Sequence, residues 1–87
     1  MFYKRADQVK VKKVGNNTAL YSSKQKGIHV LNETALFIWE VLQEPCTFDE
    51  LLYMFKEVFK GDTTRMKEDL HEILDLFLRY DLVYTEK

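Results

Sequence analysis

A chain of 87 residues, 46% of them hydrophobic, is long enough for one packed core and too short for the two lobes that form a cleft in many enzymes. A single cysteine excludes an internal disulfide, no apolar run approaches the ~20 residues that cross a bilayer, and the first residues lack the apolar core of a signal peptide. We therefore expect one cytoplasmic domain over residues 1–87, with no membrane segment.

The formal net charge of −1 conceals a division of charge along the chain. Residues 1–31 hold seven Lys or Arg against one Asp, whereas residues 32–87 hold six Lys or Arg against thirteen Asp or Glu. The chain is thus a basic half followed by an acidic half.

Three short strands are predicted in the basic half. Residues 8–14 have the two-residue period of a half-buried strand, in which Val9 and Val11 face inward and the lysines between them face outward. Glycine and asparagine then favour a hairpin into a second strand over 18–22. After a further turn, the third strand begins at Gly27 or Ile28 and ends at Leu31. Because the connections are too short for parallel crossovers, we expect an antiparallel meander.

Three amphipathic helices are predicted in the acidic half. With the residues expected to cap them, they are 33–43 after Asn32, 48–59 after Thr47, and 63–80 after Asp62 or Thr63. Thr47 and Glu50 have the spacing of a capping box, while Pro45 and Gly61 are expected to end the first two helices. Their expected buried faces hold Ala35, Phe37, Ile38, Val41 and Leu42, then Leu51, Leu52, Phe55, Val58 and Phe59, then Met66, Leu70, Ile73, Leu74 and Phe77.

Strands and helices in this order can bury one another only as a small sheet against a helical cluster. We therefore predict an α+β, winged-helix-like domain, in which a three-stranded antiparallel sheet is followed by three helices. Phe37, Trp39 and Phe55 are assigned to the core. Residues 82–84 form either extended packing or a short strand.

The chain offers little for catalysis or for a metal. Glu68, Glu72 and Asp75 share an outward helical face, where carboxylates are ordinarily solvated. Cys46, in a turn beside Pro45, is more typical of a packing residue than of a nucleophile served by one of the two histidines. Those histidines appear in no metal-ligand spacing. We therefore predict no enzyme and no cofactor or metal site.

A nucleic-acid-binding winged helix is the alternative function. Such domains often place their third helix in the major groove. Here residues 62–80 carry five carboxylates against three cationic side chains, so that helix would be repelled by DNA. Lysines of the basic half could still contact phosphates, and this alternative is disfavoured without being excluded.

The two edges of the predicted sheet differ in charge. Lys10, Lys12 and Lys13 guard the first strand against a docking chain. Residues 28–31 carry no such guard, so their free amides and carbonyls could pair with an extended peptide whose alternate side chains give specificity. The competing expectations are that residues 82–84 or a second copy of the chain covers this edge.

A stripe on the third helix could supply a pocket beside that edge. At ~100° per residue, its members flank the buried face of the helix. They are Asp69, Ile73, Leu76 and Tyr80. If this flank faces the third strand, we expect a groove with an apolar floor, an aromatic wall and an acidic side, with Lys24 and Lys26 at its other end. Core packing is the ordinary alternative for each residue.

Residues 30–40 resemble the PqqD-like family, whose members carry a Leu-Asn-x-Thr-Ala-x-x-Ile-Trp type of motif after two or three short strands. Residues 47–51 match the family's Thr-x-x-Glu-Leu, and Asp69 stands where the family has an Asp-led helix. Asp81 departs from the pattern, because the family usually has Gly there. The resemblance extends from about residue 11 to residue 84.

This resemblance implies a RiPP recognition element, a domain without catalytic activity or cofactor. Such domains bind the leader segment of a ribosomally made precursor peptide and present it to a modifying enzyme, often a radical SAM enzyme, or to a leader peptidase. In the family the leader adds as a strand beside the third strand and packs against the third helix. The site expected here consists of Lys24, Lys26, Ile28, His29, Val30, Leu31, Asp69, Ile73, Leu76 and Tyr80, in a monomer or homodimer.

Overall fold

The computed structural model describes residues 1–23 and 27–87. In this part of the chain the elements are, in order, β1 (Phe2–Arg5), β2 (Val9–Val14), β3 (Asn17–Ser22), β4 (Ile28–Leu31), α1 (Glu33–Val41), α2 (Phe48–Val58), α3 (Thr63–Arg79) and β5 (Val83–Glu86). β2, β3 and β4 form one antiparallel sheet in that order, and β1 pairs with β5 in a second sheet. The predicted α+β class, with a three-stranded antiparallel sheet followed by three helices, is confirmed.

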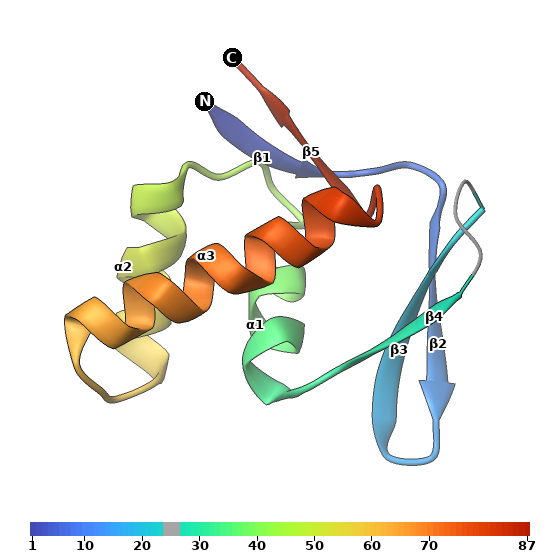
Figure 1. Cartoon of the computed structure of the whole chain (residues 1–87), viewed down its shortest axis with the longest axis horizontal. Coiled ribbons are helices and arrows are strands. Elements are labelled where there is room, and N and C mark those ends of the chain that lie inside the picture. Colours follow the sequence, from blue (N-terminus) through green and yellow to red (C-terminus); the bar gives the residue numbers. More distant parts are fainter. Residues whose placement is uncertain (24–26) are drawn as a thin grey trace.

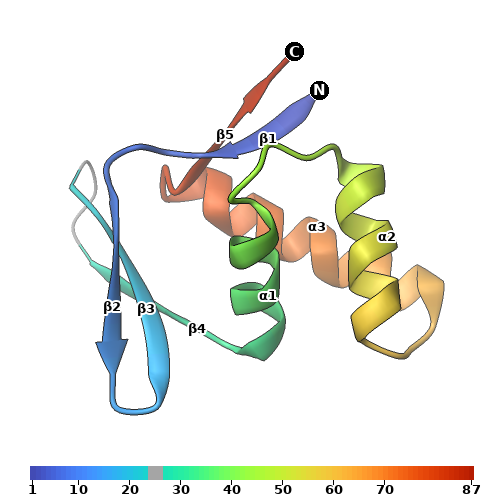
Figure 2. The same cartoon turned by 180° about the vertical axis from the view of Figure 1, so that it is seen from behind.

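The three-stranded sheet lies at one end of the molecule and the helices at the other (Figure 1). Seen from behind, α1 stands between the sheet and α2, with α3 on the far side (Figure 2). The β1–β5 pair crosses one margin of this arrangement and brings the two chain ends side by side. None of the described helices combines the length and apolarity needed to cross a membrane.

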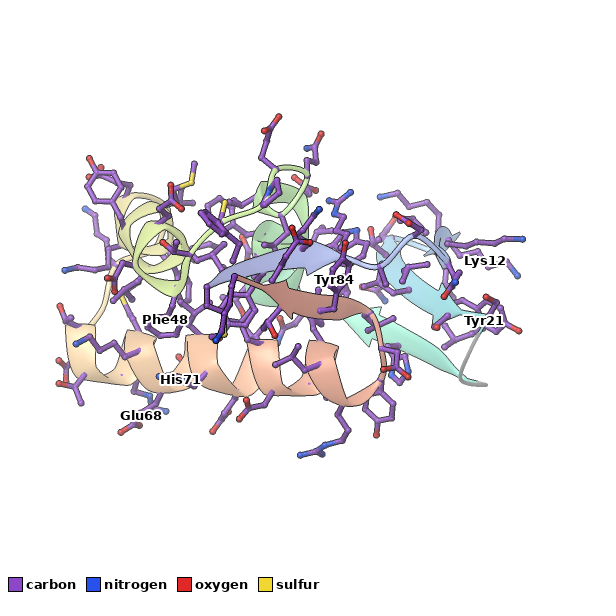
Figure 3. The ribbon with its side chains drawn as sticks, turned by 90° about the horizontal axis from the view of Figure 1, so that it is seen from above. Lys12, Tyr21, Phe48, Glu68, His71 and Tyr84 are labelled. Carbon is purple, nitrogen blue, oxygen red and sulfur yellow. The ribbon has the colours of Figure 1, made fainter. Side chains whose placement is uncertain are left out.

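The register of the sheet decides which side chains share a face. Val11 pairs with Leu20 and Leu20 with His29, so these three point to the same face, and Leu20 is fully buried there. Val11 thus points to the inner face as expected, but it remains 54% exposed, and the expectation that it is packed into a core is wrong. The reason is its position on β2, the edge strand farthest from α3 (Figure 3).

Each predicted N-cap is present. The Asn32 side chain accepts from the backbone N–H of Ala35 at 2.8 Å, and Thr47 and Glu50 form a reciprocal capping box. The Asp62 side chain accepts from the N–H of Thr64 at 3.2 Å. The helices end one or two residues earlier than expected. Gly61 does not adopt the left-handed conformation of a C-terminal glycine. The described residues with positive φ are Gly15, Gly27 and Asp81.

The core lies between α1, α2, α3 and the helix-facing side of the sheet. Trp39 meets Phe77 edge to face, with ring centroids 5.9 Å apart, and Phe55 is buried beside Phe59. Phe37 is only partly buried and packs on Phe59. Val58, expected on the buried face of the second helix, is exposed.

β1 and β5 form a ribbon that the sequence did not predict as a pair. Tyr3 and Cys46 exchange backbone hydrogen bonds of 2.8 and 3.2 Å, which join β1 to the segment before α2. The Arg5 guanidinium lies over the Trp39 ring at 4.3 Å and donates from Nε to the Trp39 carbonyl at 2.9 Å. The ribbon is therefore attached to the helical core, and Val83 is buried within it.

The C-terminus of α3 turns sharply into this ribbon. The N–H of Asp81 donates to the carbonyl of Leu78, and the N–H of Leu82 donates to the carbonyl of Phe77 at 2.9 Å. This pair of bonds is a Schellman motif, with Asp81 in the left-handed position at φ 56°.

Candidate functional site

β4 is an edge strand. The sheet order places β3 on one side of it, and within the described residues no strand lies along the other. The rival expectation that residues 82–84 cover this edge is wrong, because β5 pairs with β1 instead. The backbone of β4 is therefore open to an added strand, as its lack of charged side chains predicts.

The side chains of β4 alternate between two environments. Ile28 and Val30 are 52% and 57% exposed on the outer face of the sheet. His29 is partly buried and Leu31 is 5% exposed on the face toward the helices. An added strand would meet both environments with its own alternate side chains.

The flank of α3 faces this edge, which is the condition that the expected groove requires. β4 is the strand of the sheet nearest α3 (Figure 3). The rings of His29 and Tyr80 lie 4.2 Å apart between centroids. A hollow of about 190 Å³ between β4, the start of α1 and α3 is lined by Val30, Leu31, Asn32, Ala35, Glu72, Ile73 and Leu76. Leu76 is 37% exposed and Ile73 is half-buried, so the groove has an apolar floor that solvent can reach.

The acidic side of the groove is Glu72 and not Asp69. Asp69 lies on another hollow, which it lines together with Thr34 and Arg65. Glu72 stands one helical turn before Leu76 and lines the groove itself. The helical angle placed Glu72 on a solvated face, and the missed signal is that spacing of four residues from Leu76. Lys24 and Lys26, predicted at the other end, lie outside the described residues.

The structure thus brings together His29, Leu31, Ile73, Leu76 and Tyr80, and Val30, although on the outer face of the sheet, also borders the same hollow. It places Ile28 on the outer face and Asp69 beyond the groove. Asn32 and Ala35, which sequence reasoning used only as a cap and a core residue, line the same hollow. Asn32 forms the turn that joins β4 to α1 and Ala35 lies in the first turn of α1, so their closeness to β4 in the sequence could have indicated this position.

In the described part of the chain, Cys46 and His71 contact residues other than each other. The Cys46 thiol is buried, with Sγ 3.3 Å from the Glu44 carbonyl oxygen. Burial raises its pKa, and the nearby carboxylates of Glu50 and Glu44 raise it further. His71 stacks on Phe48 with ring centroids 4.3 Å apart (Figure 3). The described residues contain no group of three His, Cys, Asp or Glu placed to hold a metal ion.

Lys10 and Lys12 of β2 lie away from α3. Lys10 and Lys12 share the outer face of the sheet with Tyr21 and Ile28, around a hollow of about 370 Å³. Lys12 and Tyr21 project at the end of the molecule opposite α2 (Figure 3). The exposed side chains of α3 include four carboxylates against Arg65, Lys67 and Arg79, so the helix that would enter a major groove has a net negative charge.

Three solved structures share this fold. TbiB1 in complex with the TbiA(beta) leader peptide aligns with a TM-score of 0.80 at 19% identity, over 95% of this chain and 99% of that one. A lasso peptide synthetase B1 complexed with the leader peptide aligns with a TM-score of 0.76 at 12% identity, over 95% and 98%. The solution structure of the PqqD truncation of Methylobacterium extorquens PqqCD, a stand-alone RiPP recognition element, aligns at 0.74 and 10% identity, over 97% and 89%.

A search of curated proteins finds no match to the chain. The family model described as Coenzyme PQQ synthesis protein D (PqqD) matches residues 17–83, which extend from β3 through α3 to the start of β5. Most of the chain, including both walls of the groove, is therefore covered by that match, and the protein belongs to the PqqD family.

Proposed function

We propose that this domain binds the leader segment of a ribosomally made precursor peptide and presents it to a modifying enzyme or a leader peptidase. The observation that supports this proposal is the open edge of β4 beside the apolar flank of α3. Two of the similar structures are complexes with leader peptides, and all three share the fold.

In the proposed complex, the leader lies antiparallel to β4 and adds a fourth strand to the sheet. One set of its alternate side chains enters the groove, where Leu31, Ile73 and Leu76 receive apolar groups. Tyr80, held against His29, forms the aromatic wall. The other set of side chains lies beside Ile28 and Val30 on the outer face.

The proposed mechanism is tethering. A bound leader holds the segment to be modified close to the partner enzyme, which raises its effective concentration there without any chemistry by this domain. The partner enzyme is a radical SAM enzyme, another modifying enzyme or a leader peptidase. Lys24 and Lys26 are also proposed to contact the leader.

A proline scan of β4 tests strand addition. Neighbouring residues of a strand direct their N–H groups to opposite sides, and proline has no N–H. Proline at a position bonded to β3 should lower the free energy of unfolding. Proline at a position facing the open edge should leave the fold intact and weaken peptide binding about tenfold. Ile28→Pro and Val30→Pro should therefore both give one of these two results, and His29→Pro should give the other.

The peptide for this scan is selected from a random library displayed on phage by panning on the folded domain. Calorimetry gives its affinity for each variant, and urea unfolding gives each variant's stability. If every folded proline variant binds the peptide as tightly as the unmodified domain does, strand addition at β4 is wrong.

A further inference from the structure

Glu72 is unusual among the residues around the groove. Of the described side chains that line the hollow between β4 and α3, it is the charged one, and the others are apolar apart from Asn32. A carboxylate beside an apolar floor can bind a cationic group of a ligand, which an apolar side chain cannot do.

The helix supplies Glu72 with no cation. The residues three and four positions away from it are Glu68, Asp69, Asp75 and Leu76. Like charges at these spacings are unfavourable. The other carboxylates of this stretch differ, because Arg65 stands within one turn of Glu68 and Asp69, and Arg79 stands one turn after Asp75. Glu72 is therefore the carboxylate of α3 whose charge remains to be balanced from outside the helix.

The basic half of the chain does not supply that cation from the described residues. Lys10 and Lys12 lie on the outer face of the sheet, on the far edge strand, and Lys13 of the same strand donates from Nζ to Thr18 Oγ1 at 3.0 Å. Lys4 pairs with Glu86 on the β1–β5 ribbon, with Nζ and Oε2 3.5 Å apart. A ligand in the groove can bring the missing charge.

We propose that Glu72 determines the specificity of the groove and selects peptides that carry Lys or Arg two positions before an apolar residue. This inference rests on the strand addition proposed above and adds the chemistry of the peptide. The apolar side chain fills the hollow against Leu76 and Ile73, and the cation meets the Glu72 carboxylate.

The spacing and the order follow from the geometry. Glu72 and Leu76 are one turn apart, ~6 Å along the helix axis. Two residues of an extended peptide span ~6.6 Å and point to the same side. Along β4, His29 lies at Tyr80 and Leu31 lies near Glu72, so β4 runs from the C-terminal end of α3 toward Glu72. A peptide antiparallel to β4 therefore passes Glu72 first and Leu76 second.

Asp75 provides the matched control. It carries the same charge on the same helix, three residues after Glu72. Asp75 is not among the residues that line the hollow. Burial raises the pKa of the Tyr3 phenol on β1, and the Asp75 carboxylate is near enough to raise it further. A change at Asp75 alters the net charge of the helix equally without touching the groove.

The test is a parallel selection. Random peptides displayed on phage are panned on the unmodified domain, on Glu72→Lys and on Asp75→Lys, each checked for helical circular dichroism. The unmodified domain and Asp75→Lys should enrich peptides with Lys or Arg two positions before an apolar residue. Glu72→Lys should instead enrich Asp or Glu at that position.

The affinity of a selected peptide measures the same contact without a reversed charge. Because the pair is partly solvated, Glu72→Gln should weaken binding about fivefold at low salt, and Asp75→Asn should leave it unchanged. Replacing the peptide's cation by norleucine should remove the difference between the unmodified domain and Glu72→Gln.

The outcomes separate this inference from the proposed function. Peptides that converge on an apolar residue with no preference for a cation, or a preference that Glu72→Lys leaves unchanged, overturn the role of Glu72 while peptide binding stands. Equal affinity of Glu72→Gln and the unmodified domain for a Lys-containing peptide overturns it as well, even if Glu72→Lys does not fold. Failure of every pool to converge overturns both proposals.

Discussion

At Asp81 the backbone adopts a conformation that residues other than glycine rarely adopt. Its φ of 56° allows the two hydrogen bonds that end α3 and direct the chain into β5. Asp tolerates this region better than most residues with a Cβ, because its short side chain can bond locally. The departure from the family's usual glycine therefore changes the residue while the turn is kept.

Two substitutions at this position isolate the backbone contribution. Asp81→Gly and Asp81→Ala both remove the carboxylate, but only Ala keeps a Cβ that is strained at positive φ. We expect the glycine variant to be more stable than the alanine variant by about 1 kcal/mol in urea unfolding. Equal stabilities would show that the turn does not constrain φ at this residue.

The caps illustrate what single residues reveal in advance. Asn32 and Thr47 each sit just before an apolar periodic run, and each caps the helix that it was expected to cap. The sequence placed Asp69 in the groove and Glu72 on a solvated face, whereas Glu72 lines the groove and Asp69 lines another hollow. A helical wheel gives the direction of each side chain around the helix axis, but it gives no information on the angle at which β4 crosses α3. Packing between elements sets that angle.

At the scale of elements, local signals identified the strands and helices that are joined by short turns. β2 to β4 and all three helices have such signals, and their order specified the sheet. β1 was missed, since Phe2–Arg5 has no turn to a neighbouring partner and its partner strand is at the other end of the chain. Only folding brings such strands together.

Adjacent residues of β1 test how firmly the ribbon is held. Tyr3 is buried against the core, whereas Phe2, its neighbour on the same strand, points to solvent. Tyr3→Ala should lower the free energy of unfolding by about 3 kcal/mol, and Phe2→Ala by less than about 0.5 kcal/mol. Similar losses for the two variants in urea unfolding would contradict the alternation described for β1.

Across the whole molecule, the division of charge along the sequence becomes a division in space. The basic half forms the sheet, and the acidic half forms the helices. The fold class followed from the order of the elements, and the groove lies where the two halves meet. The order of the elements along the chain did not predict where the β1–β5 ribbon lies, because either end of the chain could have paired with β4 instead.

Alkaline pH should destabilise the fold through two groups joined at the ribbon. Burial is the main cause that raises the pKa of both Tyr3 and Cys46. The unfolded chain therefore loses these protons first, at about the ordinary thiol pKa of 9.0 and phenol pKa of 10.0. Their contribution to stability is complete below those values and is lost as pH rises through the raised pKa values of the folded state.

Urea unfolding between pH 7 and pH 10 measures this loss. The free energy of unfolding should fall as pH rises above about 8.5. The fall should be smaller in Cys46→Ala and smaller still in Cys46→Ala with Tyr3→Phe, which lack the titrating groups. A slope unchanged in the double variant would assign the alkaline loss to other residues.

The pairing of β1 with β5 also sets how the domain responds to mechanical load. Phe2 stands opposite Glu86 and Arg5 opposite Val83, so both chain ends leave from the same end of the ribbon. A force that draws the ends apart acts on one rung at a time and unzips the ribbon, because antiparallel hydrogen bonds lie perpendicular to the strands. β4 is not part of this ribbon. Tension applied through the termini therefore reaches the open edge of β4 only after the β1–β5 ribbon has separated.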